Sequence, residues 1–385
     1  MFHEFQQIVQ SPDQYARDWK ARTKGKVIGY FCSYVPEEII YAAGILPVRV
    51  LSSLEPEKES AAHIASMYCP FSRGVIGRLL SGGYEYLDGV IIARTCQQNL
   101  QAFESYVAEM ETRGKSLFHY QVGMPMLTGP EARKRFGTKP KDFLIAELKD
   151  FKASLENWSG SRISEEALDR SIEVYNTNRR LLRQLWKLRR NDPPPFSGTE
   201  AMQISLSMML MDKAAGNTLL KNLIEQLATR QNGPKSGTRL MIAGGENWDI
   251  RILALVESLG ANVVVDDLCM GSRYFWNEII PEKDRLAAIA ARYLDRPPCP
   301  TTDVVERRRI AHISSLIEEY NVQGVWLIQQ KFCDPHEFDN VAIASFLDSR
   351  GVPNYTSELD TTVAEGQLKI RLQAFLEMLG GELFY

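Results

Sequence analysis

The sequence contains no apolar run of the length that a membrane-spanning helix needs, which is about 20 residues. Its amino terminus, Met1–Gln7, shows no basic region followed by an apolar core, so we expect no secretory signal. Neither sign of charge is in large excess, because 45 Lys and Arg residues oppose 48 Asp and Glu residues. A net charge of −3 gives no indication of nucleic-acid or membrane binding. We therefore expect a cytoplasmic protein without nucleic-acid or membrane partners.

Three common ligand-binding patterns are also absent. The chain has neither a G-x-G-x-x-G fingerprint nor a G-x-x-x-x-G-K-[ST] phosphate loop, so any ATP that is used must bind to another chain. Its six cysteines lack the paired C-x2-C spacing of a structural zinc site. A disulfide framework is not expected in a cytoplasmic protein. The cysteines are therefore buried apolar residues, reactive thiols, or ligands that the fold brings together.

Strand and helix patterns alternate in two parts of the chain. In the first part we expect strands at 26–32, 46–50, 89–96 and 116–122. In the second part we expect strands at 239–245, 261–267, 325–328 and 352–358. The residues between these parts are helical in pattern, with helices expected from Phe143, at 168–190 and at 202–230. This order predicts an α/β fold with two doubly wound parallel-sheet domains, 1–138 and 233–385, flanking a helical segment, 139–232.

Three cysteines stand where a helix is expected to begin. Cys333 follows the apolar strand 325–328, Cys96 ends the strand before another helix, and Cys69 directly precedes Pro70. Helix amino termini carry partial positive charge and lower the pKa of thiols. In open α/β sheets, ligands bind beyond the carboxyl ends of the strands. We infer that Cys69, Cys96 and Cys333 converge on an iron–sulfur cluster.

The other cysteines are lesser candidates. Cys32 follows the first expected strand and would face the same crevice, and Cys269 lies in another loop after a strand. Cys299 stands between prolines and is expected to be structural. For any one cysteine, burial as a small apolar residue is the alternative. Three thiolates would leave one iron of a [4Fe-4S] cluster without a protein ligand.

Basic residues recur with helical spacing in the middle segment. Arg179, Arg183, Lys187 and Arg190 are predicted to form one basic face, which is either solvated surface or a site for the phosphates of a coenzyme A ester. Arg273, in the loop that contains Cys269, suits an anionic group.

Residues that can transfer protons stand beside two of the cysteines. His336 and Glu337 follow Cys333 and could act in catalysis, although a histidine at a helix start can simply cap the helix. Ser33, next to Cys32, could donate a hydrogen bond within the same crevice. The segment 244–247, Gly-Gly-Glu-Asn, favours a tight turn over a phosphate site.

Taken together, these motifs resemble the family that unites 2-hydroxyacyl-CoA dehydratases with ATP-dependent benzoyl-CoA reductases. The resemblance rests on the segments 32–47, 69–74, 88–96, 266–273, 331–336 and 358–375. It implies an acyl-CoA substrate and a core of two homologous subunits, each with a cluster held by three cysteines, here Cys69, Cys96 and Cys333. It also implies a separate ATP-hydrolysing iron–sulfur activator that supplies electrons.

Within this family, the opening 32–36 and the pair Gln97-Gln98 most resemble a benzoyl-CoA reductase subunit. Such a subunit delivers low-potential single electrons to an aromatic acyl-CoA ring. One alternative is a subunit of a 2-hydroxyacyl-CoA dehydratase, which eliminates water through a ketyl radical. A second is a double-cubane reductase with an [8Fe-9S] cluster, and a third is a non-catalytic electron-relay or scaffold subunit.

Overall fold

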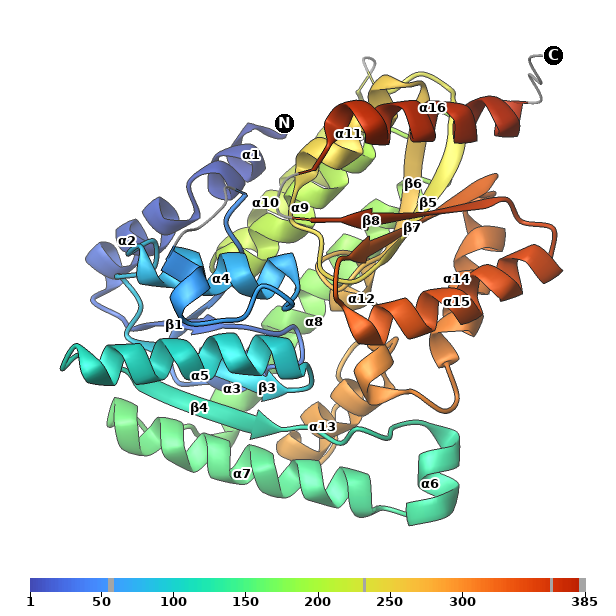
Figure 1. Ribbon diagram of the computed structural model, residues 1–385. Helices are drawn as coiled ribbons and strands as arrows, with labels where there is room; N and C mark the ends of the chain where they lie inside the picture. The colour runs from blue at the N-terminus through green and yellow to red at the C-terminus, as the bar shows by residue number, and fades with distance from the viewer. Residues whose placement is uncertain (55–58, 231–232, 361–362, 381–385) are drawn as a thin grey trace.

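Two four-stranded sheets form the framework of this protein, which a computed structural model describes over residues 1–54, 59–230, 233–360 and 363–380 (Figure 1). The first sheet has the order β2 (Leu46–Arg49), β1 (Val27–Tyr30), β3 (Gly89–Arg94), β4 (Phe118–Gly123). The second has the order β6 (Ala261–Asp267), β5 (Thr238–Gly244), β7 (Gly324–Gln330), β8 (Asn354–Leu359). Every pair of neighbouring strands is parallel. The predicted α/β fold, with two parallel sheets and a helical segment between them, is confirmed.

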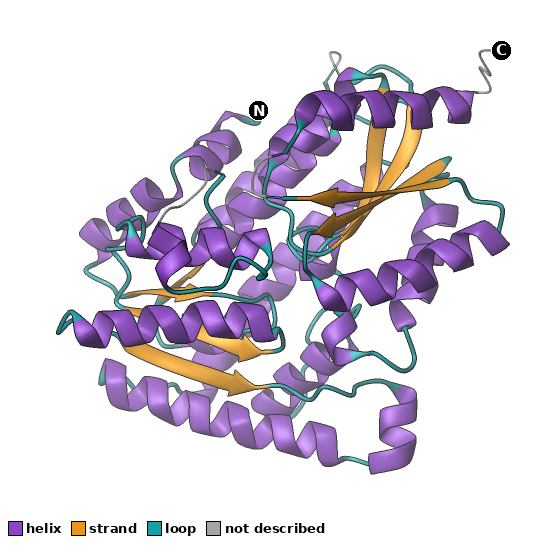
Figure 2. Cartoon of the chain, in the orientation of Figure 1, coloured by secondary structure: helices purple, strands orange, loops and turns teal. Residues whose placement is uncertain are grey.

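Helices cover the sheets and fill the space between them (Figure 2). Around the first sheet lie α1 (His3–Gln10), α2 (Pro12–Thr23), α3 (Glu37–Ala42), η1 (Glu59–Ala62), α4 (Pro70–Leu80) and α5 (Gln97–Thr112). After the short helix α6 (Pro130–Phe136), the middle segment forms α7 (Lys139–Ser159), α8 (Glu165–Leu188), α9 (Gly198–Leu210) and α10 (Lys213–Leu227). The rest are α11 (Ile250–Ser258), α12 (Ser272–Phe275), α13 (Arg285–Asp295), η2 (Pro300–Thr302), α14 (Arg308–Glu319), α15 (Asp334–Ser349) and α16 (Glu365–Gly380). In the described ranges, no helix is both long and apolar enough to cross a membrane.

The two faces of the first sheet belong to different parts of the core. Successive side chains of a strand point to opposite faces, so Val27 packs in one apolar cluster and Ile28 in the other. The cluster around Ile28 includes Leu286 and Ile289 of α13, which follows the second sheet's first two strands in sequence. The chain thus returns to the first sheet before it completes the second. The domain boundaries stay a prediction, and residues 231–232, at one of them, lie outside the described ranges.

The expectation of one continuous helix over 202–230 is wrong. α9 ends at Leu210, Met211 is extended, and α10 begins at Lys213. The side chain of Asp212 accepts a hydrogen bond from the backbone N–H of Ala215, which makes it the N-cap of α10. An N-cap aspartate stabilises a helix start, because it satisfies a backbone donor that has no partner within the helix. The apolar spacing on both sides of this break hides it in the sequence.

Candidate functional site

One pocket of the protein is lined by all six of its cysteines. Its walls come from residues that follow strands of both sheets, so it lies where the carboxyl ends of β1, β3, β5, β6 and β7 approach one another. It contains about 690 Å³ of space free of protein atoms, part of which is open to solvent. This is the location that parallel α/β sheets use for ligands.

Cys69, Cys96 and Cys333 are the N-cap residues of α4, α5 and α15, as their sequence positions predicted. A side chain two residues after Cys96 joins the three segments. Gln98 Oε1 accepts a hydrogen bond of 2.6 Å from the backbone N–H of Cys69, and Gln98 Nε2 donates one of 2.6 Å to the carbonyl oxygen of Phe332. Phe332 has a φ of 62°, a left-handed conformation that few residues adopt, and it directly precedes Cys333. The backbone is therefore bent and tied so that the three cysteines line one cavity.

These three thiols are electrostatically coupled. Although a helix amino terminus was expected to lower the pKa of these thiols, burial outweighs it and raises the pKa of Cys69, of Cys96 and of Cys333 above the usual value for a thiol. A thiolate at Cys69 further raises the pKa of Cys96, and thiolates at Cys69 and Cys96 raise that of Cys333. Three thiolates at this place therefore need a cationic partner, as metal ions provide.

The chemistry of the donors fits an iron–sulfur cluster. In a cubane each thiolate binds a different iron. Sulfur is also the donor that iron–sulfur clusters use. Cys69, Cys96 and Cys333 are thus suited to a cluster.

The remaining three cysteines line the same pocket. Cys32 Sγ lies 3.3 Å from the hydroxyl of Thr95, and Arg273 Nη2 donates a hydrogen bond of 2.9 Å to Cys269 Sγ. A hydrogen bond from Cys269 lowers the pKa of Cys299 to about 7, and the same bond, together with burial, raises the pKa of Cys269 to about 12. The second set of thiols therefore contains one ionisable pair next to a guanidinium group. These cysteines contribute more to the pocket than their sequence positions indicated.

Buried guanidinium groups make the pocket wall cationic. Arg273 and Arg296 line the pocket and are 1% and 2% exposed. Arg273, predicted to bind an anion, also donates to the carbonyl oxygen of Gly244 and forms an ion pair with Asp267. Arg296 Nη1 donates to the carbonyl oxygen of Ser33 at 2.6 Å, and Nη2 lies 3.3 Å from its hydroxyl oxygen. Ser33, a candidate catalytic residue, is thus held in the wall.

His336 lines the pocket, whereas Glu337 is not among the residues that line it. Burial lowers the pKa of His336, and the adjacent Arg309 acts in the same direction. Arg309 Nη1 lies 3.3 Å from His336 Nδ1. The imidazole is therefore neutral at neutral pH.

Glu246 is a pocket residue that the sequence pattern did not reveal. Its Oε1 accepts a hydrogen bond of 2.9 Å from Arg49, a fully buried residue at the end of β2. Its Oε2 is buried without a hydrogen-bond partner in the described part of the chain. The position of Glu246 just after β5 is the signal that could have identified it, because ligands bind beyond strand ends. The turn was expected, but its carboxylate was not assigned to the site.

Comparison with known proteins places this architecture in a family. The family model for the 2-hydroxyglutaryl-CoA dehydratase D-component matches residues 32–379, which include all six cysteines. The chain belongs to this family. Members of the family carry iron–sulfur clusters, and the chain is a subunit of a 2-hydroxyacyl-CoA dehydratase or benzoyl-CoA reductase family enzyme.

Several curated proteins resemble this family member over most of their length. It is 25% identical over 380 residues to the (R)-phenyllactyl-CoA dehydratase beta subunit of Clostridium sporogenes, covering 98% of each chain. It is 26% identical over 385 residues to the beta subunit of (R)-2-hydroxyglutaryl-CoA dehydratase from Acidaminococcus fermentans, covering 98% of this chain and 99% of that one. One of the benzoyl-CoA reductase subunits from Thauera aromatica is 25% identical over 347 residues, covering 88% of this chain and 86% of that one.

This family member does not have the basic face that was predicted on α8. Arg179 is buried and forms an ion pair with Glu38, and Arg183 pairs with Glu278, whereas Lys187 is exposed. Arg190 follows the end of α8 and pairs with Glu319. None of these four basic residues lines the cysteine pocket. Residues eight apart on an α-helix are rotated by about 80° about its axis, so Arg179 lies on the buried side of α8 and Lys187 on the exposed side. A phosphate site on these residues stays an untested proposal, and the buried pairing of Arg179 argues against its participation.

A buried histidine behind the pocket predicts a loss of stability in mild acid. His312 Nε2 lies 3.9 Å from Asp267, and burial lowers the pKa of His312 from 6.5 to about 4. Between pH 6.5 and 4 the unfolded chain therefore binds a proton that the folded chain does not, so the free energy of unfolding falls as the pH falls. The loss is on the order of 3 kcal/mol. Urea unfolding at pH 7 and pH 4.5 measures it.

The histidine variant His312→Asn is the control for this pH dependence. It removes the titrating group, so the stability loss between the two pH values should shrink. His336, whose pKa is also lowered, adds to the slope in both proteins. An unchanged slope in His312→Asn would assign the effect to other groups.

Proposed function

We propose that this protein is a cluster-bearing subunit of a 2-hydroxyacyl-CoA dehydratase. The observation that carries the proposal is the convergence of Cys69, Cys96 and Cys333, tied together by Gln98, in one pocket. We prefer the dehydratase activity because the matches to two dehydratase beta subunits cover 98% and 99% of those chains. The match to the benzoyl-CoA reductase subunit covers 86% of its chain. The dehydratase alternative thus takes precedence over the reductase interpretation that the sequence motifs favoured.

In this proposal the three thiolates hold a [4Fe-4S] cluster, which supplies low-potential electrons and has one iron without a protein thiolate. Arg273 offsets negative charge at Cys269 and Cys299 in the same pocket, since opposite charges attract strongly where water is excluded. Ser33 and neutral His336 provide polar groups at the pocket wall. The partners are a homologous sister subunit, as the name beta subunit of the relatives suggests, and an ATP-hydrolysing iron–sulfur activator. The substrate is an acyl-CoA.

An activity screen tests this function. The anaerobically reconstituted chain, with its sister subunit, the activator, ATP and a strong reductant, is given a 2-hydroxyacyl-CoA or benzoyl-CoA. Mass spectrometry should detect loss of water from the hydroxyacyl ester. Reduction of the benzoyl ring instead would restore the reductase interpretation. If neither ester is converted and neither binds to the isolated chain, an electron-relay or scaffold subunit is favoured.

A second candidate function is a double-cubane reductase that acts on small molecules. The observation that favours it is the presence of Cys32, Cys269 and Cys299 in the pocket that Cys69, Cys96 and Cys333 also line. Six thiols could hold two cubanes as an [8Fe-9S] cluster within one chain. The buried guanidinium groups near Cys269 would then offset the charge of the second set of thiolates.

The iron content separates these two candidates. A dehydratase subunit with one cubane should bind about four irons per chain, whereas a double cubane requires about eight. In the single-cubane protein, Cys299→Ala should leave the iron content unchanged. In the double-cubane protein the same substitution should lower it, and the hydroxyacyl ester should not be converted. Colorimetric iron and sulfide determination on the reconstituted chain gives the answer.

A further inference from the structure

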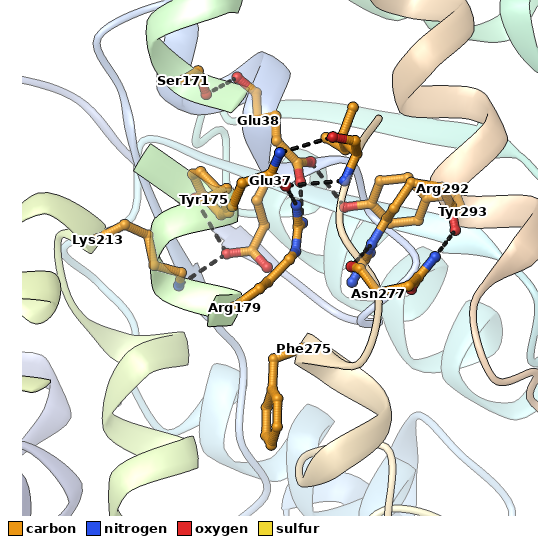
Figure 3. Close-up of polar contacts among 12 residues, drawn as sticks. Glu37, Glu38, Ser171, Tyr175, Arg179, Lys213, Phe275, Asn277, Arg292 and Tyr293 are labelled. Atoms are coloured by element: carbon orange, nitrogen blue, oxygen red, sulfur yellow. Dashed lines mark hydrogen bonds and ion pairs between the residues drawn. The ribbon is translucent and has the colours of Figure 1, made fainter. Parts of the chain in front are cut away.

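Glu38 is a fully buried carboxylate that does not line the cysteine pocket. Figure 3 shows its polar contacts. Its Oε1 accepts a hydrogen bond from Arg179, and its Oε2 lies 3.0 Å from the hydroxyl of Tyr293. The hydroxyl of Ser171 donates to the backbone carbonyl of Glu38 at 2.7 Å. Burial opposes ionisation, but Arg179 and Arg292 nevertheless hold the pKa of Glu38 below its usual value. The carboxylate is therefore charged, and both of its oxygens are engaged.

The partners of Glu38 connect three helices. Glu38 itself is on α3, Ser171 and Arg179 are on α8, and Tyr293 is on α13. The hydroxyl of Tyr293 also lies 2.9 Å from the carbonyl oxygen of Val35, in the turn between β1 and α3. One phenol thus reaches both the turn and the first residues of the helix that follows it. This arrangement ties α13 to the turn from behind the pocket.

Both of these segments continue directly into the pocket wall. The turn carries Cys32, Ser33 and Tyr34, and the chain beyond α13 carries Arg296 and Cys299, all of which line the pocket. The segments meet again there, because Arg296 donates to the carbonyl oxygen of Ser33 and the backbone N–H of Cys299 donates to the hydroxyl of Tyr34 at 3.1 Å. Two layers of contacts therefore join them, one at the pocket and one at Glu38.

We propose that Glu38 is a positioning residue that holds Cys32 and Cys299 in the pocket wall by fastening the turn before α3 to α13. The remaining pocket cysteines stand at the starts of α4, α5 and α15 or in the loop after β6. In the described part of the chain, the side-chain hydrogen bonds of Glu38 reach only α8 and α13. The proposal goes beyond the proposed function, because it holds whether the pocket binds one cubane or two. It predicts a change at Cys32 and Cys299, and at Cys269 through its hydrogen bond with Cys299, but none at Cys69, Cys96 or Cys333.

Site-resolved alkylation of the full chain without cluster tests this role. Native protein is treated with N-ethylmaleimide, and the rate at each cysteine is measured by mass spectrometry in wild type, Glu38→Gln and Tyr293→Phe. Cys32 and Cys299 should react roughly tenfold faster in both variants, which is the change expected when one buried hydrogen bond to a charged group is lost. Cys69, Cys96 and Cys333 should keep their rates.

A matched control distinguishes positioning from general loss of stability. Glu257 accepts hydrogen bonds from the backbone N–H groups of Gly198 and Thr199 at the start of α9, and it does not line the pocket. Glu257→Gln should destabilise the protein without a selective change at Cys32 or Cys299. Acceleration of all six thiols together in Tyr293→Phe, or of none, would overturn the proposal. If Glu38→Gln fails to fold, Tyr293→Phe decides alone, because it removes only one hydroxyl group.

Discussion

Replacing Cys333 by alanine is expected to reduce the iron content of the reconstituted protein from about four atoms per chain to nearly none. Cys333 is the one member of its trio that comes from the second sheet, since Cys69 and Cys96 follow the helices and strands of the first. Two thiolates from one side of the pocket do not hold a cubane, because it would then lack protein ligands on the opposite side. Iron and sulfide determination, with the visible absorption spectrum, measures the loss.

The fold should survive this change, which separates ligation from stability. Cys333 is only partly buried, so its truncation is expected to cost about 1 kcal/mol. Circular dichroism and thermal unfolding of the cluster-free chain should therefore match the wild type closely. Val341→Ala, which truncates a side chain that is 72% exposed on the same helix, α15, is the matched control and should keep the full iron content. Retention of four irons by Cys333→Ala would exclude Cys333 as a ligand.

Replacing Arg309 by methionine is expected to destabilise the protein by about 3–5 kcal/mol, because it leaves the buried carboxylate of Asp339 without its ion-pair partner and removes one of the two arginines paired with Asp267. Arg309 is 1% exposed. Its Nε lies 2.5 Å from Asp267 and its Nη1 lies 2.7 Å from Asp339, and it also donates to the carbonyl oxygen of Gly244. Methionine has a similar length but no charge, so the packing changes less than the electrostatics. Urea unfolding of the cluster-free chain measures the effect.

An exposed arginine provides the comparison for this substitution. The side chain of Arg350 is 58% exposed and lies 3.6 Å from Glu318. Exposed ion pairs contribute only about 0–1 kcal/mol, so Arg350→Met should leave the unfolding midpoint nearly unchanged. Equal effects of the two substitutions would show that the buried network around Asp267 does not stabilise the fold. Arg309→Met should also disturb His336, which lies beside the guanidinium group.

The strands were predictable because a buried parallel strand is a short apolar run that ends in a turn. The strand expected at 261–267 coincides with β6, and the others differ from the structure by a few residues at their ends. The break at Asp212 was not visible, because apolar spacing continues on both sides of a single capping residue. Helix α13 was not expected at all, although it supplies part of the first sheet's core.

The site was predictable only to the extent that it depends on local structure. A cysteine at a helix start can be read from the sequence, and Cys69, Cys96 and Cys333 were found in this way. The pairing of Arg179 with Glu38 joins residues that lie 141 positions apart, so no spacing rule reveals it. Glu246 and the second set of thiols depend on how the two sheets face each other. That arrangement is a property of the folded chain as a whole.

Cys69 and Cys96 come from the first sheet and Cys333 from the second, and this division has a consequence for biogenesis. A ribosome releases Cys69 and Cys96 early, whereas Cys333 emerges only when the last two strands and helices are being made. On the proposed assignment, a nascent chain can offer iron at most part of its coordination until the seventh strand and Cys333 have been made. Maturation of the metallocentre then waits for the second sheet, and a truncated product ending before the seventh strand could not be loaded.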